Sequence, residues 1–261
     1  MIKPLFWVWY AIGALLLILF NIPKSLEFSS GLFLILYAVY AVDLIAKGQV
    51  RTFMSDWSVN FSDEKINRSL RFQSALIWTG GMAVEWIGVH TGLLFGNYEY
   101  SAALGPLVYG VPVTLGFAWI AVVCNAALIS YDFGQTGLRS RGIRAVQVGF
   151  WSVLLDLVLD PAAHASNFWH WEDGGGLYSV PWSNFAGWFI VGGLMSLCLP
   201  KVQLSLRAAR RGTRLYQAIL IMFGLIGLRE GLVLCAGIAV IGACLAEGSL
   251  RYAGSRQVKK L

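Results

Sequence analysis

Two aspartates, Asp156 and Asp160, stand four residues apart in an apolar run that extends from Trp151 to Pro161. Four residues is just over one helical turn, so both carboxyls are expected on one helix face, roughly 5–6 Å apart. The run has the composition of a membrane-spanning helix, where a charged group is costly and usually faces the protein interior. Desolvation and mutual repulsion then favour a state in which one of the two carboxyls keeps its proton at neutral pH. Such an acid can donate a proton to a weakly basic group.

A third acid, Glu85, lies in a different apolar run, and aromatic residues surround these segments. The aromatic residues that we expect to line a pocket with the acids are Trp86, Tyr98, Trp169 and Tyr178. Ring faces stabilise cations in dry sites, so acids beside rings suit a reaction that protonates an alkene and forms a carbocation. The structural alternative is that the acids bond to polar neighbours and lock helices together, and that the rings form an interfacial aromatic belt.

Helix geometry gives each acid an expected position. If the run around Glu85 ends at Phe95, Glu85 lies roughly 15 Å deeper, near the middle of the membrane. Proline disfavours helical geometry at the residue before it, so Asp160 is expected to cap its helix near the outer boundary, with Asp156 one turn deeper. His164 and Asn184 are close enough in sequence to hold a water near this pair. The spacing of the histidines and acids matches no zinc pattern, so no metal is expected.

The composition predicts an all-α membrane protein. The chain is 57% hydrophobic and 13% charged, whereas soluble domains are nearer 25% charged. Apolar runs long enough to cross a bilayer recur along most of its 261 residues, so residues 1–261 are expected to form a single polytopic helix bundle. The net charge of +6 does not indicate nucleic-acid binding, because the basic residues lie in the connections between apolar runs.

Six apolar runs give one predicted span each, and a seventh is longer. The spans are Leu5–Asn21, Leu26–Ala46, Phe72–Phe95, Leu107–Ile129, Ala145–Pro161 and Asn184–Leu199, and the longer run is Leu215–Leu245. Arg229 and Glu230 interrupt this last run, so we expect two helices there and eight spans in all, with one kinked helix and seven spans as the alternative.

The distribution of charge orients the predicted bundle. Basic residues gather at 47–71, 139–144, 201–214 and 251–260, whereas the connections after the third and fifth spans contain acids but no Lys or Arg. Basic connections face the cytoplasm, so we expect a multi-pass protein of the cell membrane with both termini cytoplasmic. The two acidic connections also resemble each other, since one contains Tyr109-Gly-Val-Pro112 and the other Tyr178-Ser-Val-Pro181. This similarity suggests a repeated helical hairpin in which Glu85 and the aspartate pair are counterparts.

At these residues the chain resembles the membrane carotenoid biosynthesis protein family. The resemblance is carried by Glu85-Trp-Ile-Gly-Val-His90, Asp156-Leu-Val-Leu-Asp-Pro-Ala-Ala163 and Asn184-Phe-Ala-Gly-Trp188, and it covers roughly residues 72–199. Named members of the family are hydratases of gamma-carotene-type or bisanhydrobacterioruberin-type polyenes. The resemblance implies addition of water across a terminal isoprenoid double bond to give a tertiary alcohol, with a carotenoid substrate drawn from the lipid and no cofactor.

Two other functions fit parts of the pattern. Membrane prenyltransferases use an Asp-x-x-x-Asp motif to hold magnesium-diphosphate, and Asp156 and Asp160 have that spacing, although no second Asp-rich motif is present. In a carrier of lipid or pigment, the acids would be purely structural. For the hydratase, the candidate catalytic residues are Asp160, Asp156 and Glu85. The sequence does not identify the carotenoid or any protein partner.

Overall fold

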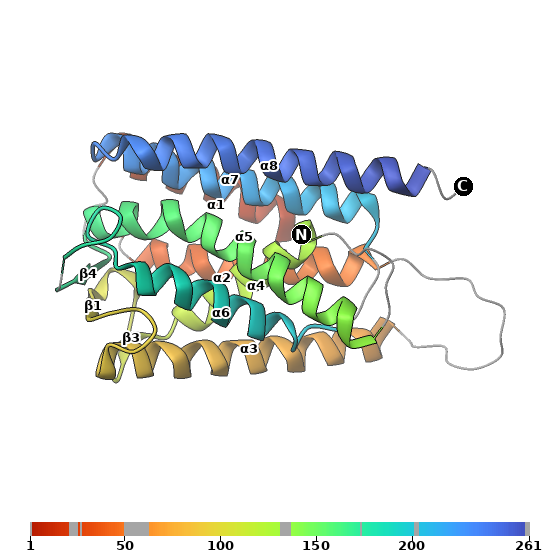
Figure 1. Ribbon diagram of the computed structural model, residues 1–261, viewed down its shortest axis with the longest axis horizontal. Coiled ribbons are helices and arrows are strands. Elements are labelled where there is room, and N and C mark those ends of the chain that lie inside the picture. Colours follow the sequence, from red (N-terminus) through yellow and green to blue (C-terminus); the bar gives the residue numbers. More distant parts are fainter. Residues whose placement is uncertain are drawn as a thin grey trace.

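The computed structural model describes residues 2–20, 26, 28–49, 63–130, 137–172, 174–200 and 204–258. These residues form eight α-helices, which confirms the predicted all-α bundle (Figure 1). The helices are α1 (Ile2–Leu19), α2 (Phe28–Gly48), α3 (Asp63–Thr91), α4 (Leu115–Ile129), α5 (Gly137–Ala165), α6 (Trp182–Ser196), α7 (Leu206–Arg229) and α8 (Val233–Val258). The predicted basic connections lie partly outside the described residues, at 50–62, 131–136, 201–203 and 259–261.

Length and apolar composition make four of the described helices, α1, α2, α5 and α8, candidates to cross a membrane. Helix α4 is the centre of the bundle and packs against α2, α3, α5, α6 and α7. It is apolar around its whole circumference, as a helix with neighbours on all sides must be. Its 15 residues span only about 22 Å at 1.5 Å per residue, less than the bilayer core of about 30 Å.

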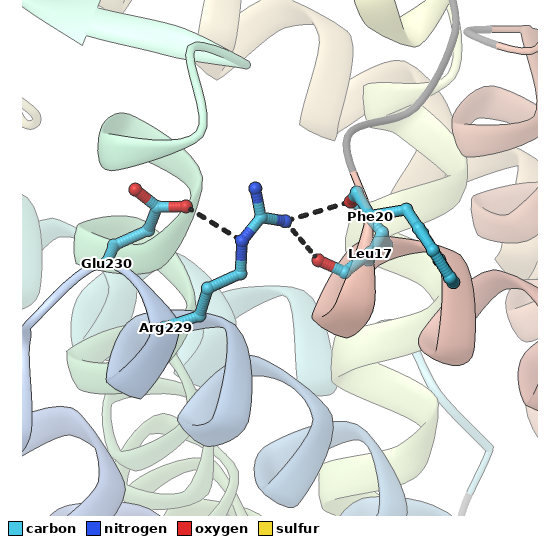
Figure 2. A network of polar contacts seen from close by, with 4 residues as sticks. All are labelled: Leu17, Phe20, Arg229 and Glu230. Carbon is cyan, nitrogen blue, oxygen red and sulfur yellow. Dashed lines mark hydrogen bonds and ion pairs between the residues drawn. The ribbon is translucent and has the colours of Figure 1, made fainter.

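The last apolar run forms two helices, which confirms the prediction of eight helices in place of seven. Helix α7 ends at Arg229, the chain turns at Gly231 with a positive φ of 81°, and α8 begins at Val233. The Arg229 guanidinium donates from Nη1 to the carbonyls of Leu17 (2.8 Å) and Phe20 (2.9 Å), as Figure 2 shows. These carbonyls belong to the C-terminal end of α1, so Arg229 both ends one helix and caps another.

Three predicted helix boundaries were wrong. Helix α3 ends at Thr91 and not at Phe95, because the chain leaves the helix through Gly92, which has a positive φ of 66°. Glu85 therefore lies six residues from the end of its helix, not ten. Helix α4 begins at Leu115, eight residues later than predicted, because residues 98–112 form short strands and turns.

Helix α5 does not end at Asp160 but continues through Pro161 to Ala165. A proline in a helix leaves the carbonyl four residues earlier without its usual donor, which here is the carbonyl of Leu157. The Sγ of Cys235, at the start of α8, lies 3.9 Å from that carbonyl and donates to it. Asp156 and Asp160 are consequently both inside a continuous helix, and Asp160 is not a cap.

The chain contains the predicted repeat at the level of structure. Helices α3 and α5 have 29 residues each, and the helices that follow them, α4 and α6, have 15 residues each. Between them lie two similar turns. Val108 pairs with Val111 across Tyr109 and Gly110, and Leu177 pairs with Val180 across a second pair of residues, all four central residues having positive φ. Two central residues with positive φ define a type I′ turn.

The two repeats meet through their strands at one end of the bundle (Figure 1). Strand β1 (Tyr98–Tyr100) pairs antiparallel with β4 (Trp169–Trp171), and Glu99 is opposite His170. This pairing relates the strands by a local two-fold, which makes Tyr98 and Trp169 counterparts, 71 residues apart. Glu85 and Asp156 are also 71 residues apart, so the repeat places an acid at the same point of α3 and α5.

Candidate active site

The aspartate pair is buried and is bridged by a single amide. Asp156 and Asp160 project from α5, and Nδ2 of Asn184 on α6 donates to Oδ2 of Asp156 (2.9 Å) and to Oδ2 of Asp160 (2.6 Å). The two carboxyls are also within hydrogen-bonding reach of each other. Among the described residues, neither carboxyl forms an ion pair with a cation. Because two adjacent buried charges without a cation are very costly, the pair is best satisfied by one shared proton.

Glu85 has the opposite environment, since three donors converge on its carboxylate. Its Oε2 accepts from the hydroxyls of Tyr98 (2.6 Å) and Tyr100 (2.7 Å), and its Oε1 accepts from Nε1 of Trp119 (2.8 Å). An ionised carboxylate is an acceptor only, and three donors at these distances match that form. The site therefore combines a carboxyl pair that retains a proton with a separate carboxylate that is held as an anion.

The two tyrosines on β1 remain donors at neutral pH. Burial raises the pKa of Tyr98 and of Tyr100 above the ordinary value of 10.0, and the negative charge of Glu85 raises both further. The same Glu85 charge that they stabilise thus opposes their ionisation. The hydrogen bonds from the strand to Glu85 keep one polarity over the whole physiological pH range.

A pair of tryptophans connects Glu85 to the neighbouring helices. The ring of Trp119 on α4 lies 4.9 Å from the ring of Trp188 on α6, centroid to centroid, with 32° between the planes. Gly81 on α3 makes room for this arrangement, because a Cβ there would lie 2.7 Å from Cδ1 of Trp119. Trp119 and Trp188 are 69 residues apart, as are Tyr109 and Tyr178 of the two turns, so the tryptophans are counterparts in the repeat.

These groups line one apolar cavity of about 230 Å³. Asp160 and Glu85 both lie on its wall, together with Asn184 and the two tryptophans. Asp156 does not reach the cavity and lies behind Asp160. The remainder of the wall is mostly aliphatic and aromatic side chains from α1, α2, α4 and α7. An apolar ligand in this cavity would therefore contact one carboxyl of the proton-sharing pair and the Glu85 carboxylate.

Comparison with known proteins agrees with this site. Residues 50–246 match the family described as carotenoid biosynthesis protein. The chain belongs to this family. One relative is the bisanhydrobacterioruberin hydratase of Haloarcula japonica, to which the chain is 36% identical over 115 residues. That match covers 44% of this chain and 39% of the relative, so well under half of the relative's length is matched. Comparison with solved structures finds no match.

Six of the nine predicted site residues of this carotenoid biosynthesis protein come together around the cavity. Five of them line it: Glu85, Tyr98, Asp160, Trp169 and Asn184. The sixth, Asp156, contacts the site through Asn184 and Asp160. Asn184 was expected to hold a water, and the structure shows that its amide nitrogen donates to both aspartates.

The other three predicted residues lie elsewhere. The Trp86 side chain is 47% exposed and packs against His90, because one step along a helix turns it about 100° away from Glu85. The Tyr178 hydroxyl accepts from the backbone N–H of Leu234, since the turn that contains Tyr178 directs its side chain toward α8. The ring of His164 stacks on His170 at 4.8 Å and is not on the cavity wall.

Sequence reasoning missed several cavity residues. Trp119 gave no signal on its own, because it is one apolar residue in a wholly apolar helix. The repeat could have revealed it, since Trp119 has the same position relative to its turn as Trp188. Tyr100 was visible as one of many aromatic residues, but only the strand geometry shows that its hydroxyl reaches Glu85. The part of the wall formed by α1 and α2 has no polar residue that the sequence would mark as functional.

Proposed function

We propose that this protein is a carotenoid end-group hydratase, which adds water across the terminal isoprenoid double bond of a polyene to give a tertiary alcohol. The observation that carries the proposal is the apolar cavity in which Asp160, one member of a proton-sharing pair, and the Glu85 carboxylate lie on the same wall. Membership of the carotenoid biosynthesis family and the name of the Haloarcula relative support a carotenoid as the substrate.

In the first step, Asp160 donates its proton to the less substituted carbon of the double bond. The alkene π electrons form the new C–H bond, and the positive charge is left on the tertiary carbon. Asn184 donates to Asp160 and Asp156, so its N–H groups stabilise the carboxylate that remains. Asp156 acts from behind as the partner that holds the proton before transfer.

The cation is formed beside groups that favour positive charge. The faces of Trp119 and Trp188 lie on the cavity wall, and the Glu85 carboxylate is held next to them by the indole N–H of Trp119. Ring faces and a fixed anion in a dry site stabilise a cation without reorganisation. This assigns Glu85 to the capture side of the reaction, with Asp160 on the protonation side.

In the second step, a water oxygen bonds to the tertiary carbon and gives up one proton. Glu85 is the acceptor on the cavity wall, and return of the proton from Glu85 to Asp160 restores the starting state. The sum of the two steps is one alkene plus one water giving one alcohol, with no net oxidation. The chemistry as written needs no redox cofactor.

The cavity fits one end of the substrate and not the whole polyene. Pockets that enclose a complete drug-sized ligand are about 300–1,000 Å³, and this cavity is about 230 Å³. A long polyene resides in the bilayer, so we propose that the protein works as a multi-pass protein of the cell membrane, with both termini cytoplasmic, and takes its substrate from the lipid.

The test is to express the chain in a host that makes an anhydro-carotenoid and to analyse the extracted pigments by mass spectrometry. A product heavier by one water is expected with the wild type, and it should be absent with Asp160→Asn at equal levels of folded protein. An extended isoprenoid released with diphosphate would instead indicate a prenyltransferase. Unchanged polyene that copurifies with the protein, and no product, would indicate a carrier.

A further inference from the structure

The cavity is open to its surroundings at one place, which the described residues identify. Of the described residues that line it, those with exposed side chains are Ile12 (56%), Leu26 (37%) and Phe28 (61%). The polar members of the wall, Glu85 and Asp160, are buried. The opening thus lies where α1 ends and α2 begins, and the reacting groups are inside.

The surface around this opening is apolar. On α1 the exposed large side chains are all hydrophobic: Leu5, Val8, Ile12, Leu15 and Leu19. This helix is one of the candidate membrane spans and is the one with the smallest buried share. An exposed face of this composition on a membrane helix faces lipid and not water. The cavity therefore opens sideways toward hydrocarbon.

Helix α1 is nonetheless held in place at several points along its length. The hydroxyl of Tyr10 donates to the carbonyl of Ala218 on α7 (2.8 Å). Arg229 binds the carbonyls of Leu17 and Phe20 (Figure 2). Leu17 is itself part of the cavity wall, so the arginine fixes the side of the opening that α1 forms.

The opening lies outside the part of the chain that matches the family. The family match begins at residue 50, whereas α1 and α2 end at Leu19 and Gly48. All three carboxyls of the site are inside the matched part, but much of the cavity wall comes from the unmatched α1 and α2. The chemistry and the recognition of the rest of the substrate are thus carried by different segments.

We propose that the segment formed by α1 and α2 is the binding site for the polyene tail and determines which carotenoid is accepted. The proposal rests on the hydratase function. The end group occupies the cavity beside Asp160, and the conjugated chain leaves past Ile12, Leu26 and Phe28 into the lipid. The occupant is a long apolar chain because the cavity is smaller than a polyene and its opening is apolar and faces hydrocarbon.

The experiment compares two substrates that share the terminal double bond, a full-length acyclic carotenoid and a short isoprenoid that fits inside the cavity. The variants Ile12→Trp and Phe28→Trp narrow the opening. Leu15→Trp is the matched control, since Leu15 is also on α1, is 55% exposed and does not line the cavity. The measured quantity is the ratio of kcat/KM for the long substrate to kcat/KM for the short one.

We expect this ratio to fall about tenfold or more in Ile12→Trp and Phe28→Trp, the effect of a bulky side chain in a packed space, and to stay at the wild-type value in Leu15→Trp. An unchanged ratio in both opening variants, with both substrates hydrated, would refute the tail site and leave the hydratase function intact. A wild-type protein that hydrates neither substrate would refute the function itself. Equal loss in Leu15→Trp would show a general effect of bulk on α1 and would also overturn the proposal.

Discussion

Asn184 is the residue whose replacement tests the proton-sharing pair most sharply. Its amide nitrogen donates to both aspartates, at 2.9 Å and 2.6 Å, and the side chain is buried. Asn184→Leu keeps a side chain of similar size but removes both donors. A hydrogen bond to a charged group contributes about 1.5–3 kcal/mol and a neutral one about 0.5–1.5 kcal/mol. The change should therefore cost about 2–4 kcal/mol of stability.

The same bonds stabilise the Asp160 carboxylate once it has given up its proton, so the variant should also lose activity. A loss of about 2–4 kcal/mol in the transition state lowers the rate roughly 30-fold to 1,000-fold. The assay is conversion of an anhydro-carotenoid per folded molecule. Folded protein is counted by thermal unfolding in detergent.

Asn125→Leu is the matched control. Asn125 is also a buried asparagine with two hydrogen bonds, from the Tyr37 hydroxyl (2.8 Å) and to the carbonyl of Gly212 (2.8 Å). Its loss should lower stability by about 2 kcal/mol, because both bonds are neutral, but conversion per folded molecule should be retained. The reasoning is refuted if Asn184→Leu converts the carotenoid at the wild-type rate, or if Asn125→Leu loses conversion to the same extent.

Four further outcomes follow from the structure. Tyr98→Phe and Tyr100→Phe each remove one donor from Glu85, and each should lower conversion per folded molecule roughly tenfold to 100-fold, the value of one charge-assisted bond; wild-type rates in both would contradict the role of the anion. Burial and the charge of Glu85 raise the pKa of both tyrosines, so their stabilising contribution is complete below their ordinary value of 10.0 and is lost as the pH rises beyond it; an absorbance titration that finds all tyrosines ionising near pH 10.0 without unfolding would oppose this. Arg229→Met removes the cap of α1 and should lower the thermal unfolding midpoint and increase proteolysis near that end of α1, whereas unchanged cleavage would show that the cap is dispensable. Trp86→Phe should leave conversion unchanged, because the side chain is exposed and lies off the cavity, and a large loss would return Trp86 to the site.

The sequence was sufficient to predict the fold class and the helix count. Apolar runs reveal membrane helices because every residue in contact with lipid or core must be hydrophobic, and Arg229 with Glu230 marked the break between α7 and α8. Boundaries were less predictable. The break at Gly92 looked like a continuation because hydrophobic residues follow it, and Pro161 looked like an end although Cys235 supplies a replacement donor.

The candidate site was predictable where the chemistry is local and not where it depends on direction. The carboxyls were found because charge in an apolar run is costly and therefore conspicuous. Trp86 and Tyr178 were assigned to the cavity by sequence proximity, but a side chain's direction depends on helix phase and turn geometry. Trp119 was missed because an apolar residue in an apolar helix carries no signal until the packing of α4 is known.

Isotope labelling tests the central claim, proton transfer from a buried carboxyl followed by capture of solvent water, most directly. The wild type and Asp160→Asn are supplied with an anhydro-carotenoid in deuterium oxide enriched in heavy oxygen, and the product is examined by mass spectrometry and NMR. We predict that the wild-type product carries one deuterium on the carbon next to the carbinol carbon and heavy oxygen in the hydroxyl, and that Asp160→Asn gives no product. A hydroxylated product without deuterium at that carbon, or full conversion by Asp160→Asn, would contradict the mechanism.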